Sequence, residues 1–252
     1  MIFNLGSINI DRVYQVPYMP GPGETLTALS YARFLGGKGV NTSVAIAQAG
    51  GEVQHLGAVG SDGDWALQQI ASFGLDMASI EKLESAATGN AVIYVDPQAE
   101  NQIVICGGAN QAVPLAYIKQ SLHAAESGAW AVLQNETNNG PEFVALAKAQ
   151  GLKVAYAAAP FIAGIAVDML DKVDLIAVNE TEAAQLAQAT GKAVDQLGCD
   201  VLMTRGAQGA DYYANGEKTS QAAFKVDPVD TTGAGDTFFG SFLAELAATQ
   251  ST

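Results

Sequence analysis

The alternation of apolar and polar positions along the chain predicts a regular succession of strands and helices. Short apolar runs, typical of buried strands, alternate with longer segments in which apolar residues recur at helical spacing. Strands are expected at 2–5, 25–34, 53–59, 91–95, 102–105, 130–133, 154–156, 175–178 and 201–204. Helices are expected at 42–49, 64–73, 115–125, 141–149 and 180–190. Such alternation is typical of βαβ units, so we predict an α/β fold with a mainly parallel sheet that is doubly covered by helices.

Two segments depart from this alternation, because their strands are joined by turns rather than by helices. They lie around residues 13–34 and 91–105, and the second contains a polar turn at 96–101. We expect strands drawn from about 10–35 and 88–106 to leave the main sheet and form a small β-sheet lid. The 252 residues contain no linker, internal repeat or low-complexity tract, so we expect a single domain over residues 1–252.

Polar residues follow several expected strands, at the sheet edge where parallel α/β folds bind ligands. These residues are Glu136, Asn179, Glu182 and Thr204. Near the N-terminus, Asn9 and Asp11 alternate with isoleucines, so a strand would place both side chains on one face. An amide beside a carboxylate suits a hydroxyl-rich ligand, although solvated loop residues fit the same spacing.

Two glycine-rich turns each lead into a helical pattern. The first is Gly36-Gly37-Lys38-Gly39-Val40-Asn41, and the second is Asp230-Thr231-Thr232-Gly233-Ala234-Gly235-Asp236-Thr237-Phe238. Glycine lets the backbone approach a ligand closely, and a helix N-terminus attracts anions. Asp236 would then be a carboxylate beside an anion pocket, but it also fits a simple helix N-cap. The chain contains neither a P-loop nor a dinucleotide-binding fingerprint.

Composition narrows the classes of partner. The formal net charge of −14 disfavours nucleic acid and anionic membranes, so we expect neither as a partner. The longest uncharged apolar run, 154–167, is short for a membrane span and contains Pro160 and Gly164. The two cysteines and two histidines lack metal-ligand spacing, and the first residues lack the pattern of a signal peptide. These features predict a cytoplasmic protein.

Three motifs, in this order, resemble the signatures of the ribokinase-like (PfkB) family of small-molecule kinases. They are residues 36–41, the sequence Asn179-Glu180-Thr181-Glu182, and residues 230–238. The resemblance runs from residue 1 to the C-terminus. Within the family, residues 6–11, 22–26 and 107–110 look most like the members that phosphorylate ribose. The resemblance implies a ribokinase-like fold and ATP-dependent phosphorylation of the primary hydroxyl of a sugar, with ribose or a close pentose as the expected substrate.

The resemblance also implies a role for individual residues. Asp236 would be the base that takes the proton from the hydroxyl, beside an anion hole made by Gly233, Ala234 and Gly235. The sugar hydroxyls would be held by Asn9, Asp11, Gly37, Lys38, Asn41 and Glu136. The nucleotide would be bound by Asn179, Thr204, Gly206 and Gly209.

Two metal sites are implied as well. Glu182, with Asn179, would position Mg²⁺ through water, as suits an ion that keeps much of its hydration shell. Taken alone, Glu182 also fits an exposed first-turn acid that the helix dipole favours. Asp230 and Thr231 resemble part of a site for a monovalent cation, expected to be K⁺. The implied ligands are thus a sugar, ATP, Mg²⁺ and K⁺, and a homodimer through the β lid is a further expectation.

The sequence also departs from the family pattern. Members usually continue for several tens of residues past the helix that follows the aspartate, whereas this sequence stops at Thr252, so we expect the C-terminal part of the fold to be missing from it. The segment 191–201 is short, and Tyr156-Ala157-Ala158-Ala159-Pro160 replaces an Asn-Pro turn. Two alternatives therefore stay open. One is a kinase of another sugar, a sugar acid or a nucleoside, and the other is a sugar- or nucleotide-binding protein with impaired catalysis.

Overall fold

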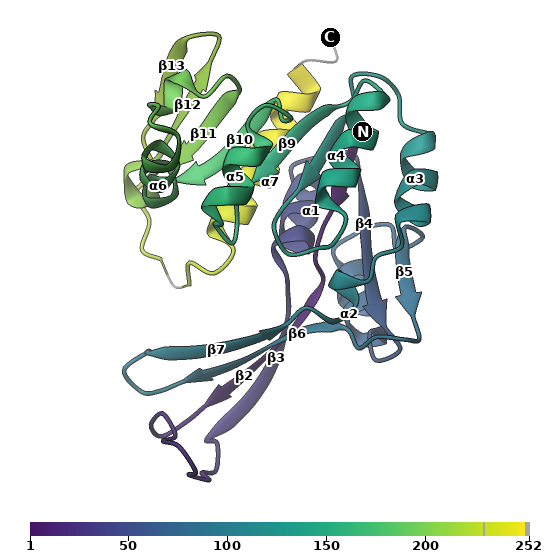
Figure 1. Ribbon diagram of the computed structural model, residues 1–252. Helices are drawn as coiled ribbons and strands as arrows, with labels where there is room; N and C mark the ends of the chain where they lie inside the picture. Colours follow the sequence, from purple (N-terminus) through teal and green to yellow (C-terminus); the bar gives the residue numbers. More distant parts are fainter. Residues whose placement is uncertain (229, 250–252) are drawn as a thin grey trace.

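The computed structural model describes residues 1–228 and 230–249, so Val229 and residues 250–252 lie outside the described residues. Nine strands form one large sheet (Figure 1). They are β1 (Ile2–Leu5), β4 (Val53–Gly60), β5 (Ile80–Leu83), β8 (Trp130–Leu133), β9 (Lys153–Ala157), β10 (Leu175–Asn179), β11 (Asp200–Thr204), β12 (Ala210–Ala214) and β13 (Glu217–Gln221). Their order is β13-β12-β11-β10-β9-β8-β1-β4-β5.

This sheet is parallel from β5 to β11, and only the β11–β12–β13 edge is antiparallel. Every residue of the central strands β1 and β8 is buried, as expected where both faces of a sheet are covered. The predicted α/β class with a mainly parallel, doubly covered sheet is therefore confirmed. Among the described residues, no helix combines the length and the apolar character that crossing a membrane requires.

The helices form two layers on the large sheet. They are α1 (Lys38–Gln48), α2 (Asp64–Ser72), α3 (Leu115–His123), α4 (Gly140–Ala149), α5 (Ala163–Met169), α6 (Glu180–Thr190) and α7 (Ala234–Thr249). Helices α3, α4, α5 and α6 lie on one face of the sheet, and α1 and α7 lie on the other (Figure 1). The buried residues of the first group share one apolar cluster with the sheet, Ile46 of α1 and the buried residues of α7 share a second, and Val40 of α1 joins α2 in a third. Short 3-10 turns occur at Gly108–Gln111, Val194–Gln196 and Gly206–Gln208.

Helix α1 begins four residues earlier than the predicted start at 42. The turn occurs at Gly37, whose φ of 102° favours glycine, and a Cβ there would lie 2.8 Å from the carbonyl oxygen of Ser7. Lys38 and Asn41 therefore lie in the first turn of α1, three residues apart and on neighbouring positions of one helix face.

Buried polar side chains hold α1 against the sheet. The Asn4 side chain of β1 donates hydrogen bonds to the carbonyl oxygen of Gly39 and to the Ser43 hydroxyl, both at 2.8 Å. Ser43 is also 2.9 Å from Nδ1 of His55. Burial lowers the pKa of His55 to about 4, so this imidazole is neutral near pH 7. His55 therefore supports the packing of α1 against the sheet through Ser43.

A separate four-stranded sheet projects from the carboxyl edge of the large one (Figure 1). Its strands, in spatial order, are β3 (Ser30–Gly36), β2 (Asn9–Gln15), β6 (Gly89–Val95) and β7 (Asn101–Cys106). The predicted second sheet is confirmed, but the predicted strand over 25–34 is wrong at its start. Strand β3 begins at Ser30, which pairs with Gln15 of β2, and the preceding Leu29 N–H donates to the carbonyl oxygen of Gln15 at 2.7 Å.

Candidate active site

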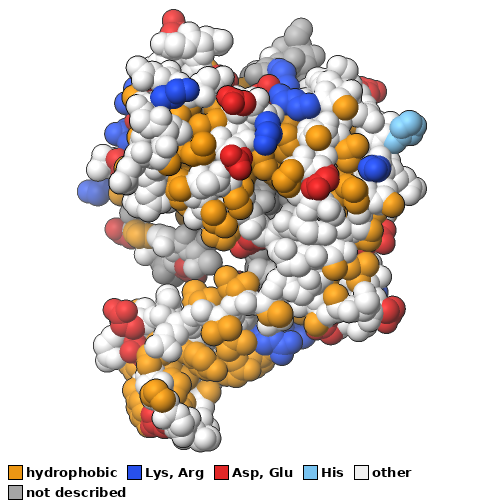
Figure 2. Space-filling model, viewed as in Figure 1, with side chains coloured by type: hydrophobic (Ala, Val, Ile, Leu, Met, Phe, Trp, Pro, Cys, Tyr) orange, Lys and Arg blue, Asp and Glu red, His pale blue; other side chains and the backbone are white. Residues whose placement is uncertain are grey.

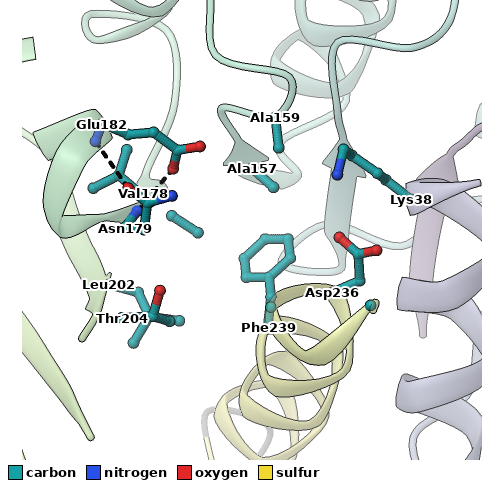
Figure 3. A pocket seen from close by; sticks show the side chains of 13 residues that line it. Lys38, Ala157, Ala159, Val178, Asn179, Glu182, Leu202, Thr204, Asp236 and Phe239 are labelled. Carbon is teal, nitrogen blue, oxygen red and sulfur yellow. Dashed lines mark hydrogen bonds between the residues drawn. The ribbon is translucent and has the colours of Figure 1, made fainter. Parts of the chain in front are cut away.

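A pocket lies where the carboxyl ends of β9, β10 and β11 meet the first turns of α1 and α7. Lys38 and Asp236 face Asn179, Glu182 and Thr204 across it (Figure 3). Between these polar groups the lining is apolar, with Ala157, Ala159, Ala177, Leu202 and Phe239 among its members. Polar residues that the sequence separates widely thus converge on one cavity.

Asp236 lies in the first turn of α7, and its carboxylate Oδ2 accepts a hydrogen bond of 3.0 Å from the side chain of Asn41. Burial raises the pKa of Asp236, while the Asn41 hydrogen bond and the charge of Lys38 oppose that rise. The helix begins at Ala234, so Asp236 is a residue of the first turn rather than the N-cap. Its carboxylate is held by the facing helix α1 and is directed at the pocket.

The glycine turn before Asp236 has the conformation that a helix start of this kind requires. Gly233 has a φ of 70°, and its carbonyl oxygen accepts from the Thr237 N–H at 2.8 Å. The Ala234 N–H donates to the Thr231 carbonyl oxygen at 3.1 Å, so this amide already has a partner. Gly233 and Gly235 line the pocket, and the first N–H groups of a helix have no partner within it.

The Glu136 carboxylate connects the loop after β8 to the start of α1. Its Oε2 accepts from the Ser7 hydroxyl at 2.5 Å and from the backbone N–H of Lys38 at 2.9 Å. An anion at this position also stabilises the N-terminus of α1 through the helix dipole. Glu136 is therefore fixed beside Lys38, which lines the pocket.

Asn9 and Asp11 occupy one face of β2, as their spacing predicted. The Asn9 side-chain oxygen accepts from Asn110 at 2.8 Å, which leaves the Asn9 amide nitrogen for another partner. Burial, and to a smaller extent the charge of Glu136, raise the pKa of Asp11 to about 6. The Asp11 carboxylate lies against Gly36, where a Cβ would come within 2.0 Å of Oδ2.

Asn179 and Glu182 form a capping box at the start of α6. The Asn179 side chain accepts from the Glu182 N–H at 2.9 Å, and the Glu182 carboxylate accepts from the Asn179 N–H at 2.8 Å. Glu182 thus acts as a first-turn acid that stabilises the start of α6. Figure 3 shows its other carboxylate oxygen directed into the cavity, where it remains available to a ligand.

The remaining predicted residues lie at or beyond the pocket edge. Thr204 lines the pocket, whereas Gly206 and Gly209 lie in the turn that follows β11, with φ values of 52° and 104°. Asp230 and Thr231 are exposed residues just before α7, and the Asp230 carboxylate accepts from the Thr232 N–H at 2.8 Å. Within residues 1–228 and 230–249, no group of three His, Cys, Asp or Glu side chains is placed to hold a metal ion.

Sequence reasoning missed several residues of this region. Ser7, Asn110 and Gly36 support Glu136, Asn9 and Asp11 respectively, although each belongs to a motif that the sequence made visible. Ala157 and Ala159 stood out in the sequence only as a departure from the family pattern, and no motif marked Ala177 or Phe239 as pocket lining.

Comparison with known proteins shows similarity to one family of carbohydrate kinases, both in sequence and in structure. The model of the pfkB family of carbohydrate kinases matches residues 1–252. Ribokinase of Haemophilus influenzae is 38% identical, with 96% of this chain and 84% of that protein covered. The crystal structure of ribokinase from Thermotoga maritima is similar with a TM-score of 0.86 at 29% identity, covering 98% of this chain and 86% of that one. Arabidopsis thaliana ribokinase complexed with ribose and ATP has a TM-score of 0.83 at 26% identity, with 98% and 86% covered.

Proposed function

The chain belongs to the pfkB family of carbohydrate kinases, and we propose that it transfers the γ-phosphoryl group of ATP to the primary hydroxyl of ribose or a close pentose. The observation that carries this proposal is the Asn41–Asp236 hydrogen bond at the wall of a pocket lined by Lys38, Gly233 and Gly235. It combines a carboxylate base, a cation and a helix N-terminus, which are the groups that phosphoryl transfer needs.

Asp236 acts as the base. It accepts the proton of the sugar hydroxyl while the hydroxyl oxygen forms a bond to the γ-phosphorus and the bond to the ADP oxygen breaks. Asn41 holds the carboxylate in place through its 3.0 Å hydrogen bond. The N–H groups of Gly233 and Gly235 and the Lys38 ammonium stabilise the charge that spreads over the equatorial phosphoryl oxygens. The Ala234 N–H donates to the carbonyl oxygen of Thr231, so Ala234 can join this anion hole only after that hydrogen bond breaks.

The sugar site favours a neutral polyol. The charge of Glu136 acts on Asp11, and we assign both carboxylates to the sugar, where they would repel an anionic sugar acid and accept hydrogen bonds from hydroxyl groups. Asn9, the backbone at Gly37, Lys38 and Asn41 complete the set of groups that we assign to the sugar. The ribokinases of Haemophilus influenzae and Arabidopsis thaliana, the second complexed with ribose and ATP, support the choice of ribose.

We assign the nucleotide to the other side of the pocket, along Asn179, Thr204, Gly206 and Gly209. Mg²⁺ would be held there by Glu182 through water, and it would neutralise phosphate charge when bound. The residues fit such an ion, because one Glu182 oxygen faces the cavity and Mg²⁺ prefers water and phosphate oxygens to an all-protein cage. Asp230 and Thr231 would contribute to a K⁺ site before α7. ATP as a substrate supports the cytoplasm as the compartment.

We assign the second sheet, within 10–35 and 88–106, as a lid over the sugar in a single domain. It also offers a surface for a homodimer, because hydrophobic side chains gather over it (Figure 2). Strand register places Phe34, Ile103 and Ile105 on the face that carries Asp11, and these side chains are 56%, 51% and 61% exposed. A second copy that packs there would cover the apolar face and the sugar together.

A panel of sugars, sugar acids and nucleosides, assayed for ATP consumption, tests the function. We expect turnover with ribose or a close pentose, and a loss of kcat of about 10²-fold or more in Asp236→Asn with a much smaller change in sugar affinity. Equal losses of kcat and affinity would contradict the base assignment. Turnover of nucleosides alone would contradict the sugar assignment, and sugar binding without turnover would support the impaired-catalysis alternative.

A further inference from the structure

A buried tyrosine beneath the pocket makes one specific hydrogen bond. Tyr156 lies on β9, opposite Leu133 of β8, and its residue surface is fully buried. Its hydroxyl donates to the side-chain oxygen of Asn135 at 2.8 Å. Burial raises the pKa of Tyr156 to about 12, so the phenol keeps its proton and remains a donor throughout the neutral range.

Asn135 makes two further hydrogen bonds, both to the loop that follows β9. Its backbone N–H donates to the carbonyl oxygen of Ala159 at 3.0 Å. Its side-chain amide donates to the carbonyl oxygen of Pro160 at 2.9 Å. The three bonds of Asn135 thus join the end of β8 to the end of β9 and to the loop beyond it.

The two joined segments belong to different halves of the site. Glu136, the next residue after Asn135, contacts Ser7 and the start of α1 on the sugar side. Ala157 and Ala159 line the pocket that Asn179, Glu182 and Asp236 also line. A shift of the second segment relative to the first would change the distance between the bound sugar and the transferred phosphoryl group.

We propose that Tyr156 and Asn135 are positioning residues that fix the sugar-side carboxylate Glu136 relative to the alanine wall of the phosphate pocket. The proposal rests on the proposed kinase function. Neither side chain touches the reacting atoms, so both act through the segments that they connect. Phosphoryl transfer depends strongly on alignment, and a misplacement of about 1 Å can cost 10²-fold in rate.

Tyr156→Phe removes only the hydroxyl and leaves the Asn135 oxygen without its donor. Tyr212→Phe is a matched control, because the Tyr212 hydroxyl also donates to a side chain, Asp200 at 2.6 Å, but β12 carries it away from Asn135. We expect kcat of Tyr156→Phe to fall about tenfold at saturating sugar and ATP, with a smaller change in sugar KM. Tyr212→Phe should keep kcat within about twofold of the unmodified protein. Asn135→Ala should lower kcat at least as much as Tyr156→Phe.

Amide hydrogen exchange gives a second readout that needs no substrate. Segments 134–138 and 157–161 should exchange faster in Tyr156→Phe and in Asn135→Ala but not in Tyr212→Phe. The proposal is overturned by unchanged exchange, by an unchanged kcat in Tyr156→Phe, or by an equal loss of kcat in Tyr212→Phe. If the unmodified protein turns over no sugar, the proposed function fails, and the exchange result still decides whether Tyr156 and Asn135 hold the two segments together.

Discussion

At the scale of single residues, the site depends on pairs that lie far apart in the sequence. Asn41 and Asp236 are 195 residues apart and yet share a 3.0 Å hydrogen bond, and 129 residues separate Ser7 from Glu136. Each pair couples a group that would touch substrate to one that holds it. Ser7 is not among the residues that we assign to a ligand, so a substitution of Ser7 is expected to affect the chemistry only through Glu136.

The acidity of Asp11 leads to a prediction about pH. Its pKa is raised to about 6, first by burial and then by Glu136, so the carboxylate gains a proton at a higher pH than an ordinary aspartate. The ionised form accepts hydrogen bonds from sugar hydroxyls, so kcat/KM for the sugar should fall as the pH drops through about 6.

Initial rates between about pH 5 and pH 8, at saturating ATP and low sugar, measure this profile. The substitution Glu136→Gln removes the charge that helps to raise the pKa of Asp11. The fall in kcat/KM should therefore occur at a lower pH, together with a loss of sugar affinity. An acid limb that stays at the same pH in Asp11→Asn would show that another group titrates.

The sequence predicted most of these residues because they belong to motifs, but it did not predict their partners. Asn9 and Asp11 share a strand face through simple alternation, and the structure keeps that arrangement. The contact between Asp11 and Gly36 instead depends on the register of β2 with β3, which pairs Asn9 with Gly36. Register comes from long-range packing, and no local pattern in one strand contains it.

At the scale of elements, the packing of α1 against α7 brings Asn41 to Asp236. Gly240 allows this close approach, because a Cβ there would lie 2.5 Å from the carbonyl oxygen of Thr42 and 2.7 Å from Cβ of Ala45. The short distance between α1 and α7 therefore depends on the absence of a side chain at Gly240.

Gly240→Ala should separate the two helices and lower the free energy of unfolding by about 1–3 kcal/mol, as overpacking of a core does. It should also lower kcat, because Asn41 and Asp236 move apart. Denaturant unfolding and steady-state kinetics measure the two effects.

Gly164→Ala is the matched control, since Gly164 lies in α5 with open space around its Cβ position. The added methyl group should raise the free energy of unfolding by up to about 1 kcal/mol and leave kcat unchanged. Comparable destabilisation by both substitutions would contradict the packing argument.

Elements with a clear apolar run or helical spacing were predicted well, and elements with a weak pattern were missed. Strand β8 and helix α6 have the predicted limits, 130–133 and 180–190. Helix α5 has only seven residues and lies within a run of apolar residues, so the segment is too short to show a helical period. Strand β13 is exposed at every residue, because it is the polar edge of the sheet, and it offers no buried face to the pattern.

At the scale of the whole molecule, the second sheet has two chemically different faces. The face that carries Asp11 is otherwise largely apolar, with Phe34, Ile103 and Ile105 exposed. The opposite face carries the clustered rings of Tyr14, Tyr31 and Tyr94 beside arginines of β2 and β3. The apolar face is the one that a second copy would cover in the proposed homodimer.

Ile105→Lys places a charge on that face, whereas Val104→Lys places the same charge one residue earlier on the opposite face of β7. Both side chains are more than half exposed, at 61% and 65%, so neither substitution should disturb the fold. Burying an unpaired ammonium is costly, so Ile105→Lys should convert a dimer to a monomer, while Val104→Lys should remain a dimer. Light scattering coupled to size-exclusion chromatography measures the mass of each. If the unmodified protein is monomeric, or if both variants dissociate alike, the apolar face is not the interface.

The same face carries Asp11, so loss of the dimer should also raise the KM for the sugar. If the KM stays constant when the dimer dissociates, the lid of a single subunit is sufficient to close the sugar site.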